Sequence, residues 1–108
     1  MFTTVFQHNA AETIDGGSQD NFPVGSLTSL EIDVTVTVNT GVLTLTYYRV
    51  DPYGNLYQVW QGSVPGTGSV TVDIGPGLTV PMNPGNMGQI NWTLGGGSAT
   101  FQLTVQGK

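Results

Sequence analysis

Few side chains in this 108-residue sequence belong to the types that carry acid–base, nucleophilic or metal chemistry. The chain has one histidine, two cationic residues and no cysteine, and its lysine is the last residue. General acid–base catalysis relies on such groups, and thiolate nucleophiles and thiolate metal sites need cysteine. The motifs G-x-S-x-G, H-E-x-x-H and G-x-x-x-x-G-K are missing from the sequence. We therefore expect a protein that is not an enzyme, with no catalytic residues, no metal and no cofactor.

The histidine, His8, lies in a polar segment near the amino terminus and has no second imidazole with which to hold a metal ion. Its expected place is on the surface or at an interface. Carboxylates are more numerous, but none has the D-x-D-x-D-G spacing of a calcium loop. Calcium binding in the loop from Glu12 to Asp20 stays an alternative. Glu31 and Asp33 are expected about 7 Å apart on the outward face of one strand, which indicates a solvated face that resists edge pairing.

The aromatic residues gather between residues 42 and 61. A flat group of aromatic rings on a β-sandwich can stack on sugars, so a carbohydrate-binding or host-adhesion module is an alternative function. The candidate stacking residues are Tyr48, Tyr53, Tyr57 and Trp60. The interpretation we favour places Tyr47, Trp60 and Trp92 in the core, with the other tyrosines at a hairpin end or a protein interface.

The charge of the chain excludes several kinds of partner. Seven acidic residues against two cations give a formal net charge of −5. Nucleic-acid binding needs several cations to release phosphate counterions, and an anionic membrane surface also requires them. No apolar run approaches the roughly 18 residues of a membrane span, and the amino terminus lacks the basic start and long apolar stretch of a secretion signal. We expect neither nucleic acid nor membrane as a partner.

Strict alternation of apolar and polar residues is the dominant pattern, and it predicts β-strands. It is clearest at Leu30, Ile32, Val34, Val36 and Val38. Similar patterns predict strands over 2–7, 30–38, 42–50, 55–61, 69–74, 89–94 and 99–105. No segment longer than a turn shows helical spacing. The predicted fold is all-β, an antiparallel β-sandwich of about seven to eight strands with helix nearly absent, and a small β-barrel is the alternative.

Turn residues suggest how the strands connect. Asn39-Thr40-Gly41 and Gly95-Gly96-Gly97-Ser98 each predict a hairpin between the strands that flank them. Asp51-Pro52-Tyr53-Gly54 predicts a tight turn, because Asp bonds the following backbone, Pro presets its dihedral angle and Gly accepts a positive φ. The segment from Gly75 to Gly88 contains three prolines and is expected to be a long crossing loop.

We divide the chain into an irregular amino-terminal arm, residues 1–25, with a possible short strand, and a single β-sandwich domain, residues 26–108. Phe22 to Gly25 is a segment that can anchor an aromatic ring against the body. The arm and the 75–88 loop are the expected contact surfaces, because both lie outside the main strand pattern and contain apolar residues that we expect to be exposed. These candidate capsid or subunit contacts are Phe2, Phe6, Phe22, Met82 and Met87.

Threonine covers the outward side of most predicted strands, which gives a surface without charge that suits packing against other proteins. The run from Gly41 to Gly54 (GVLTLTYYRVDPYG), the run from Gly68 to Leu78 (GSVTVDIGPGL) and the Thr-rich closing strands add a resemblance. Over roughly Leu27 to Gln106, the chain resembles short all-β virion proteins of tailed bacteriophages, among them capsid decoration proteins.

This resemblance implies a non-enzymatic structural protein on the outer surface of a phage capsid, bound to the major capsid protein and reinforcing the shell after assembly in the host cytoplasm. A homo-oligomer is compatible with such a role, and a tail or neck component is a further alternative.

Overall fold

The computed structural model describes residues 3–18, 21–24, 27, 29–64, 66–74 and 87–108. Within these ranges the chain forms β-strands and no helix. The strands are β1 (Thr3–Glu12), β2 (Gly16–Gly17), β3 (Phe22–Pro23), β4 (Leu30–Asn39), β5 (Leu43–Val50), β6 (Leu56–Val64), β7 (Gly68–Ile74), β8 (Met87–Thr93) and β9 (Ala99–Gly107).

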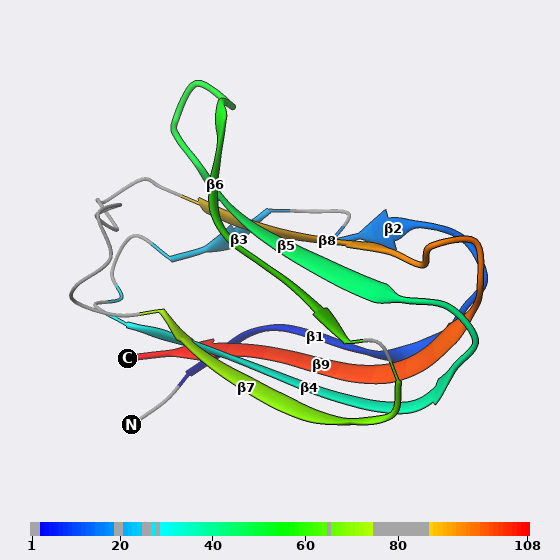
Figure 1. Ribbon diagram of the computed structural model, residues 1–108. Coiled ribbons are helices and arrows are strands. Elements are labelled where there is room, and N and C mark those ends of the chain that lie inside the picture. The colour runs from blue at the N-terminus through cyan, green and yellow to red at the C-terminus, as the bar shows by residue number, and fades with distance from the viewer. Residues whose placement is uncertain (1–2, 19–20, 25–26, 28, 65, 75–86) are drawn as a thin grey trace.

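The strands form two antiparallel sheets that pack face to face (Figure 1). Sheet A has the order β1-β9-β4-β7, and sheet B has the order β2-β8-β5-β6, with β3 also paired to β8. The predicted antiparallel β-sandwich is confirmed. The predicted strands are all present, although β1 and β6 extend beyond the predicted ranges, to Glu12 and Val64.

The core lies between the two sheets and is built from the inward residues that alternation predicted. Phe101, Ile32, Leu45 and Ile90 are completely buried there. Val38 differs from the prediction, because it is 50% exposed whereas the other apolar residues of β4 are buried. The pairing of β4 with β9 shifts register between Val36 and Val38. A bulge of this kind changes the side of the sheet to which the following residues point, so alternation ceases to predict burial there.

Two predicted hairpins are wrong. β4 pairs with β9 and β7 in sheet A, whereas β5 pairs with β8 and β6 in sheet B, so residues 40–42 cross from one sheet to the other. Residues 94–98 likewise carry the chain from β8 in sheet B to β9 in sheet A. Alternation and turn residues are local signals and do not distinguish a turn within a sheet from a crossing between sheets.

The two crossings lie against each other at one end of the sandwich. Thr40 donates its N–H to the carbonyl of Ser98 at 2.9 Å and accepts the Ser98 N–H on Oγ1 at 2.8 Å. A Cβ on Gly97 would lie 2.6 Å from the backbone nitrogen of Gly41, so the two backbones touch where a side chain would keep them apart. These contacts join the two crossings, which connect the central strands of the two sheets.

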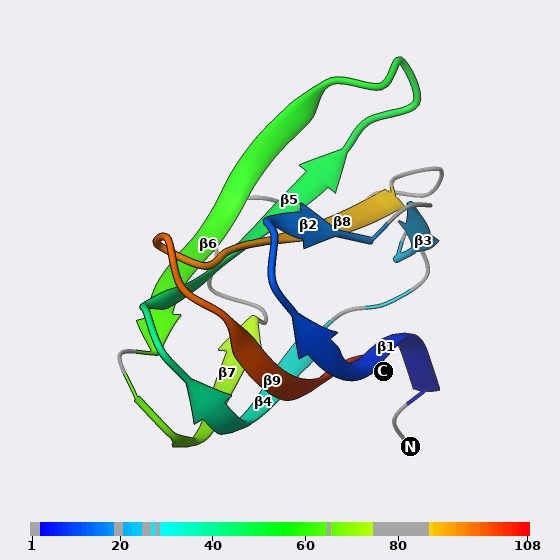
Figure 2. The ribbon, with the colours of Figure 1, turned by 90° about the vertical axis from the view of Figure 1, so that its right-hand side faces the viewer.

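The predicted turn at residues 51–54 is present and joins β5 to β6 as a hairpin. Asp51 Oδ1 accepts the N–H groups of Tyr53 and Asn55, both at 2.9 Å, and Gly54 has a φ of 87°. Figure 2 shows that the tip of this hairpin extends beyond the two packed sheets.

Candidate functional site

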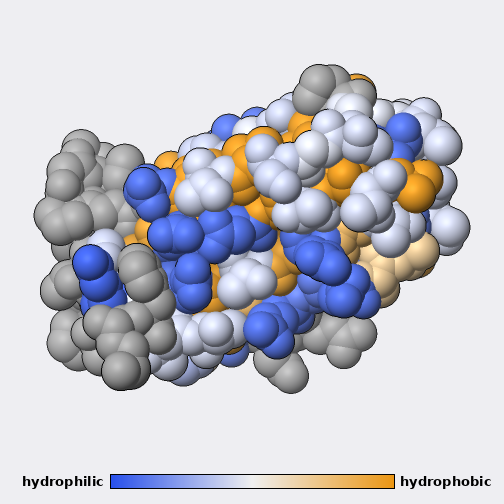
Figure 3. All heavy atoms as spheres, turned by 90° about the horizontal axis from the view of Figure 1, so that it is seen from below, coloured by the Kyte–Doolittle hydropathy of each residue, from blue (hydrophilic) through white to orange (hydrophobic). Residues whose placement is uncertain are grey.

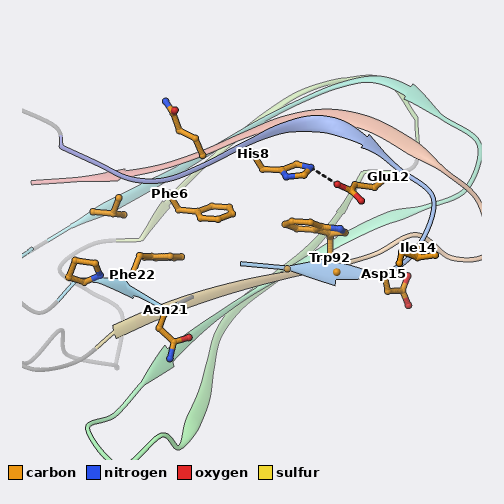
Figure 4. Close-up of a pocket in the computed structure, with 13 residues that line it drawn as sticks. Phe6, His8, Glu12, Ile14, Asp15, Asn21, Phe22 and Trp92 are labelled. Carbon is orange, nitrogen blue, oxygen red and sulfur yellow. Dashed lines mark ion pairs between the residues drawn. The ribbon is translucent and has the colours of Figure 1, made fainter. Parts of the chain in front are cut away.

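A groove opens along the side of the sandwich where β1 of sheet A faces the short strands of sheet B, and we call it the β1 groove. Its volume is about 810 Å³, within the range of ligand-binding sites. The residues that line it are Val5, Phe6, Gln7, His8, Glu12, Ile14, Asp15, Gly16, Gly17, Asn21, Phe22, Pro23 and Trp92. Figure 4 shows side chains from β1 on one wall, those of Asn21 and Phe22 on the other, and Trp92 between them.

Aromatic rings form most of the inner wall of the β1 groove. The rings of Phe6 and Phe22 stack with their centroids 5.6 Å apart, and Phe22 also lies 6.3 Å from the ring of Tyr47. His8 packs against Trp92 and Phe101, at centroid distances of 4.5 and 4.8 Å. These contacts hold the rings in fixed positions, so the groove is formed before any partner arrives.

Polar groups lie at the end of the groove near Trp92. His8 Nε2 is 3.2 Å from Glu12 Oε1, and the His8 side chain keeps 15% of its surface exposed. Asp15 Oδ1 accepts the backbone N–H of Leu94 at 2.9 Å. The indole Nε1 of Trp92 is buried, and no described residue accepts its hydrogen bond. His8 was expected at a surface or interface, and it lies in the wall of a groove.

The groove is equipped for binding. Its described lining contains no hydroxyl, thiol or amine side chain. Across the part of the chain that the structure describes, no three His, Cys, Asp or Glu side chains are grouped so that they could hold a metal ion. Asp20, part of the calcium alternative, lies outside the described residues.

Some of the predicted contact residues lie together in the structure. Phe6 and Phe22 come together in the β1 groove, and Met87 is half-buried opposite Pro23 where β3 pairs with β8. Phe22 is 4% exposed between two other rings, which confirms the predicted aromatic anchor against the body and leaves this ring little surface for a partner. Phe2 and Met82 lie outside the described residues. A contact role for these residues stays a prediction.

The four candidate stacking residues do not share one surface. Trp60 pairs with the buried Tyr47 and packs against the core, whereas Tyr48, the next residue of β5, points to the opposite side of the sheet. Tyr53 is 91% exposed at the hairpin tip, and Tyr57 is 42% exposed. The core positions predicted for Tyr47 and Trp92 are confirmed, and burial raises the pKa of Tyr47.

Hydrogen bonds organise the hairpin tip around Asp51. Its Oδ2 accepts the side-chain amide of Asn55 at 3.0 Å and the hydroxyl of Tyr57 at 3.2 Å. Together with the backbone N–H groups of the turn, these donors hold the pKa of Asp51 below its ordinary value, with the Asn55 side chain contributing most. The guanidinium of Arg49 lies 4.4 Å from the centre of the Tyr57 ring.

The outer face of sheet B carries no charged side chain on its described strands. The residues on the outward side of the strands are Thr44, Thr46, Tyr48 and Val50 from β5, Leu56, Gln58, Gln61 and Ser63 from β6, and Met87, Gln89, Asn91 and Thr93 from β8. Of these, Thr46 and Val50 are buried. Hydrogen bonds link neighbouring strands across this face, between the Thr44 and Ser63 hydroxyls at 3.0 Å and from Gln61 Nε2 to Thr46 Oγ1 at 3.0 Å. We call this surface the uncharged face.

The outer face of sheet A is acidic at one end. Glu31 pairs with Asp73 across β4 and β7, and Asp33 lies two residues along on the same side. A hydrogen bond with Asp33 is the largest cause of the raised pKa of Glu31, followed by partial desolvation and by the charges of Asp33 and Asp73. In Figure 3, which views this side of the molecule, hydrophilic side chains form much of the central surface. The two outer faces therefore differ in charge.

Sequence reasoning missed the β1 groove. It considered His8 and Glu12 separately, although Phe6, His8 and Glu12 are spaced by even numbers and so share one face of β1. That alternation was the available signal. The contribution of Trp92 had no local signal, because it reaches the groove from β8 in the other sheet.

No protein-family model matches the chain, and no curated protein matches it. Its described residues contain no apolar helix of membrane-spanning length. Among the solved structures that match is one of infectious bursal disease virus, Gx strain, with a TM-score of 0.41 and 14% identity over 98% of this chain and 26% of that chain. Another, of the Gt strain, has a TM-score of 0.32 and 16% identity over 98% of this chain and 27% of that chain. This chain spans about a quarter of the length of each.

Proposed function

We propose that this chain is a non-enzymatic structural protein of a tailed-bacteriophage virion. Its proposed place is the outer surface of the capsid, where it binds the major capsid protein as a decoration protein and reinforces the shell. The observation that carries the proposal is the uncharged face of sheet B, where Thr, Ser, Asn, Gln and Tyr side chains share the outward side of three neighbouring strands with a few apolar residues.

The composition of this face is typical of a protein interface. The centres of such interfaces are depleted in Lys, Glu and Asp and enriched in aromatic residues and Met, because charged groups lose hydration there. The uncharged face contributes Tyr48 and Met87, both half-buried, and has no charge to desolvate. Its bonds from Thr44 to Ser63 and from Gln61 to Thr46 hold the polar side chains in place before binding. Less side-chain freedom is then lost on association.

The acidic face of sheet A supports an orientation for the bound protein. Glu31, Asp33 and Asp73 lie on the side of the sandwich opposite to the uncharged face. A solvated acidic surface favours solubility and opposes the stacking of further copies, because like charges repel. In the proposed arrangement the uncharged face meets the shell and the acidic face meets solvent.

The test mixes the purified chain with empty shells assembled from the major capsid protein of the same genome, followed by sedimentation and counting of the copies retained. The chain should pellet with the shells at a fixed number of copies, at both low and high salt, because contacts without charge are insensitive to screening. Absence of binding under both conditions would contradict the proposal.

A matched pair of variants tests the face itself. Gln61→Glu puts one carboxylate on the uncharged face, and Gln102→Glu puts one on the exposed outer side of β9 in sheet A. In the first variant the Thr46 hydroxyl can donate to the carboxylate, so the fold keeps its hydrogen bond. Desolvation of an unpaired charge should weaken shell binding by about tenfold or more in Gln61→Glu and leave Gln102→Glu unchanged. Equal loss in both variants would refute the assignment of the face.

A further inference from the structure

Strand β1 has an unpaired edge that runs along the β1 groove. In the described part of the chain, β1 pairs with β9 on one side and with no strand on the other. Four consecutive residues, Val5 to His8, line the groove. From Phe6 onward the pairing with β9 is regular and successive side chains point to opposite faces of the strand, so a cavity that touches Phe6, Gln7 and His8 lies along the edge.

This edge offers hydrogen-bonding groups to an incoming chain. The bulge in β1 lies between Thr4 and Phe6, and regular pairing with β9 continues from Phe6 to Glu12. In an antiparallel pair, every second residue directs both its N–H and its C=O away from the partner strand. An extended peptide can pair with such groups and add a strand to the sheet.

The groove also contains a buried hydrogen-bond donor without an acceptor, and two carboxylates. Trp92 is 5% exposed, and its indole N–H has no hydrogen-bond partner among the described residues. A buried donor without an acceptor is unfavourable, and a peptide carbonyl would satisfy it. Glu12 and Asp15 supply carboxylate oxygens, which accept hydrogen bonds from N–H groups and attract cations.

The charge of the groove selects the occupant. Its described ionisable groups are two carboxylates and the imidazole of His8, so it favours a cationic ligand. The chain itself has two cationic residues, Arg49 and Lys108, and Arg49 stacks on Tyr57. A second copy of this chain is therefore a poor source of the cationic ligand. Sugar stacking is also disfavoured, because Trp92 and Phe22 are 5% and 4% exposed and present little open ring surface.

We propose that the β1 groove binds an extended segment of another protein that carries Arg or Lys and that pairs with the free edge of β1. The segment's basic side chains lie near Glu12 and Asp15, and its apolar residues contact Val5 and Phe6, which line the groove and are partly exposed. The site does not depend on the uncharged face. The inference rests on the proposed function for one point, that the segment belongs to another virion protein.

The experiment titrates the ¹⁵N-labelled full chain with the peptide acetyl-Val-Arg-Val-Arg-Val-amide and follows the two indole N–H resonances. Trp92 lies in the β1 groove, whereas Trp60 lines an apolar pocket between β6 and β7 and serves as an internal control. The Trp92 resonance should shift saturably, and that of Trp60 should stay in place. A peptide with citrulline for arginine, and one N-methylated on alternate backbone nitrogens, should each bind at least about fivefold more weakly.

Two variants complete the test. Glu12→Gln should weaken peptide binding by about two- to fivefold, the usual worth of one exposed ion pair, and the matched Glu31→Gln on sheet A should not. Gly16→Ala puts a methyl group 3.0 Å from Trp92 Nε1 and should abolish the Trp92 shift, with the dispersion of the amide spectrum confirming the fold.

Three results would overturn the proposal: joint movement of both indole resonances, equal binding of the N-methylated peptide, or a saturable Trp92 shift with cellohexaose in place of the peptide. Shell sedimentation reports separately on the proposed function. A chain that binds shells without binding the peptide refutes this inference alone.

Discussion

Asn39 links the first crossing between the sheets to the end of β6, and its replacement should be among the most damaging polar substitutions in the chain. Its Nδ2 donates to the carbonyls of Val64 at 2.8 Å and Gly66 at 3.2 Å, and its Oδ1 accepts the N–H of Gly41 at 3.1 Å. One side chain thereby ties the end of β4 to the end of β6 and to the first crossing.

The expected loss follows from these three bonds. A typical intramolecular hydrogen bond contributes about 1 kcal/mol, so Asn39→Ala should lower the free energy of unfolding by about 2–3 kcal/mol, with water restoring part of the loss. For a domain of this size the entropy of unfolding is about 0.2 kcal/mol per kelvin, and the midpoint of thermal unfolding should fall by about 10 °C. Asn9→Ala, on an exposed position of β1, is the matched control and should change stability by less than about 0.5 kcal/mol.

The variant Asn39→Asp distinguishes the donor role of the Asn39 side chain from its acceptor role. It keeps an oxygen for the Gly41 N–H but places a second oxygen against the carbonyls of Val64 and Gly66. At neutral pH this variant should be at least as unstable as Asn39→Ala. Because the carbonyls disfavour the ionised form, the loss should shrink relative to Asn39→Ala as the pH falls and the carboxyl group becomes a donor.

The assay is thermal and urea unfolding of the wild type and the three variants at pH 7 and pH 3.5. If Asn39→Ala costs less than about 0.5 kcal/mol, or if Asn39→Asp matches the wild type at pH 7, the crossings do not depend on this side chain and the reasoning fails.

Three further predictions concern single substitutions, each followed by thermal unfolding. Gly97→Ala places its Cβ 2.6 Å from Gly41 N and should cost about 1–3 kcal/mol, more than Gly96→Ala, where φ is 85° but the space is open. A loss at Gly97 no larger than the loss at Gly96 would show that the close contact with Gly41 is not important for stability. Asp51→Asn should destabilise most at neutral pH and progressively less below about pH 4, since the pKa of Asp51 is lowered in the folded state; a loss independent of pH would contradict this. Glu31→Gln should raise the unfolding midpoint at pH 7 and change it little at acid pH, because the raised pKa of Glu31 makes its ionised form unfavourable in the folded protein; a decrease at pH 7 would be the contrary result.

Of the functional predictions, the one on catalysis depended most directly on sequence composition. The scarcity of His, Lys, Arg and Cys led to the prediction of a protein without catalytic residues before any fold was known. The uncharged face was also foreseeable in outline, since Thr recurs on the outward side of the predicted strands. Its extent over three neighbouring strands required the pairing of β6, β5 and β8.

Local alternation determined the strands and most of the core. It placed Phe101, Leu103 and Val105 inward, as the structure confirms, because the direction of a side chain from an extended backbone depends on its own position in the strand. Where a bulge changes that direction, at Val38, alternation failed. The predicted turn at residues 51–54 was also correct, since its hydrogen bonds lie within five residues.

Tertiary structure alone decided which strands are neighbours and which residues form the groove. The turns after β4 and β8 were compatible with hairpins, and contact between Gly41 and Gly97, far apart in the chain, accompanies the crossings that occur instead. Trp92 likewise meets His8 and Glu12 only because sheet B packs on sheet A. Such contacts depend on the joint burial of both sheets, and the free energy of burial is a property of the whole core that no short segment encodes.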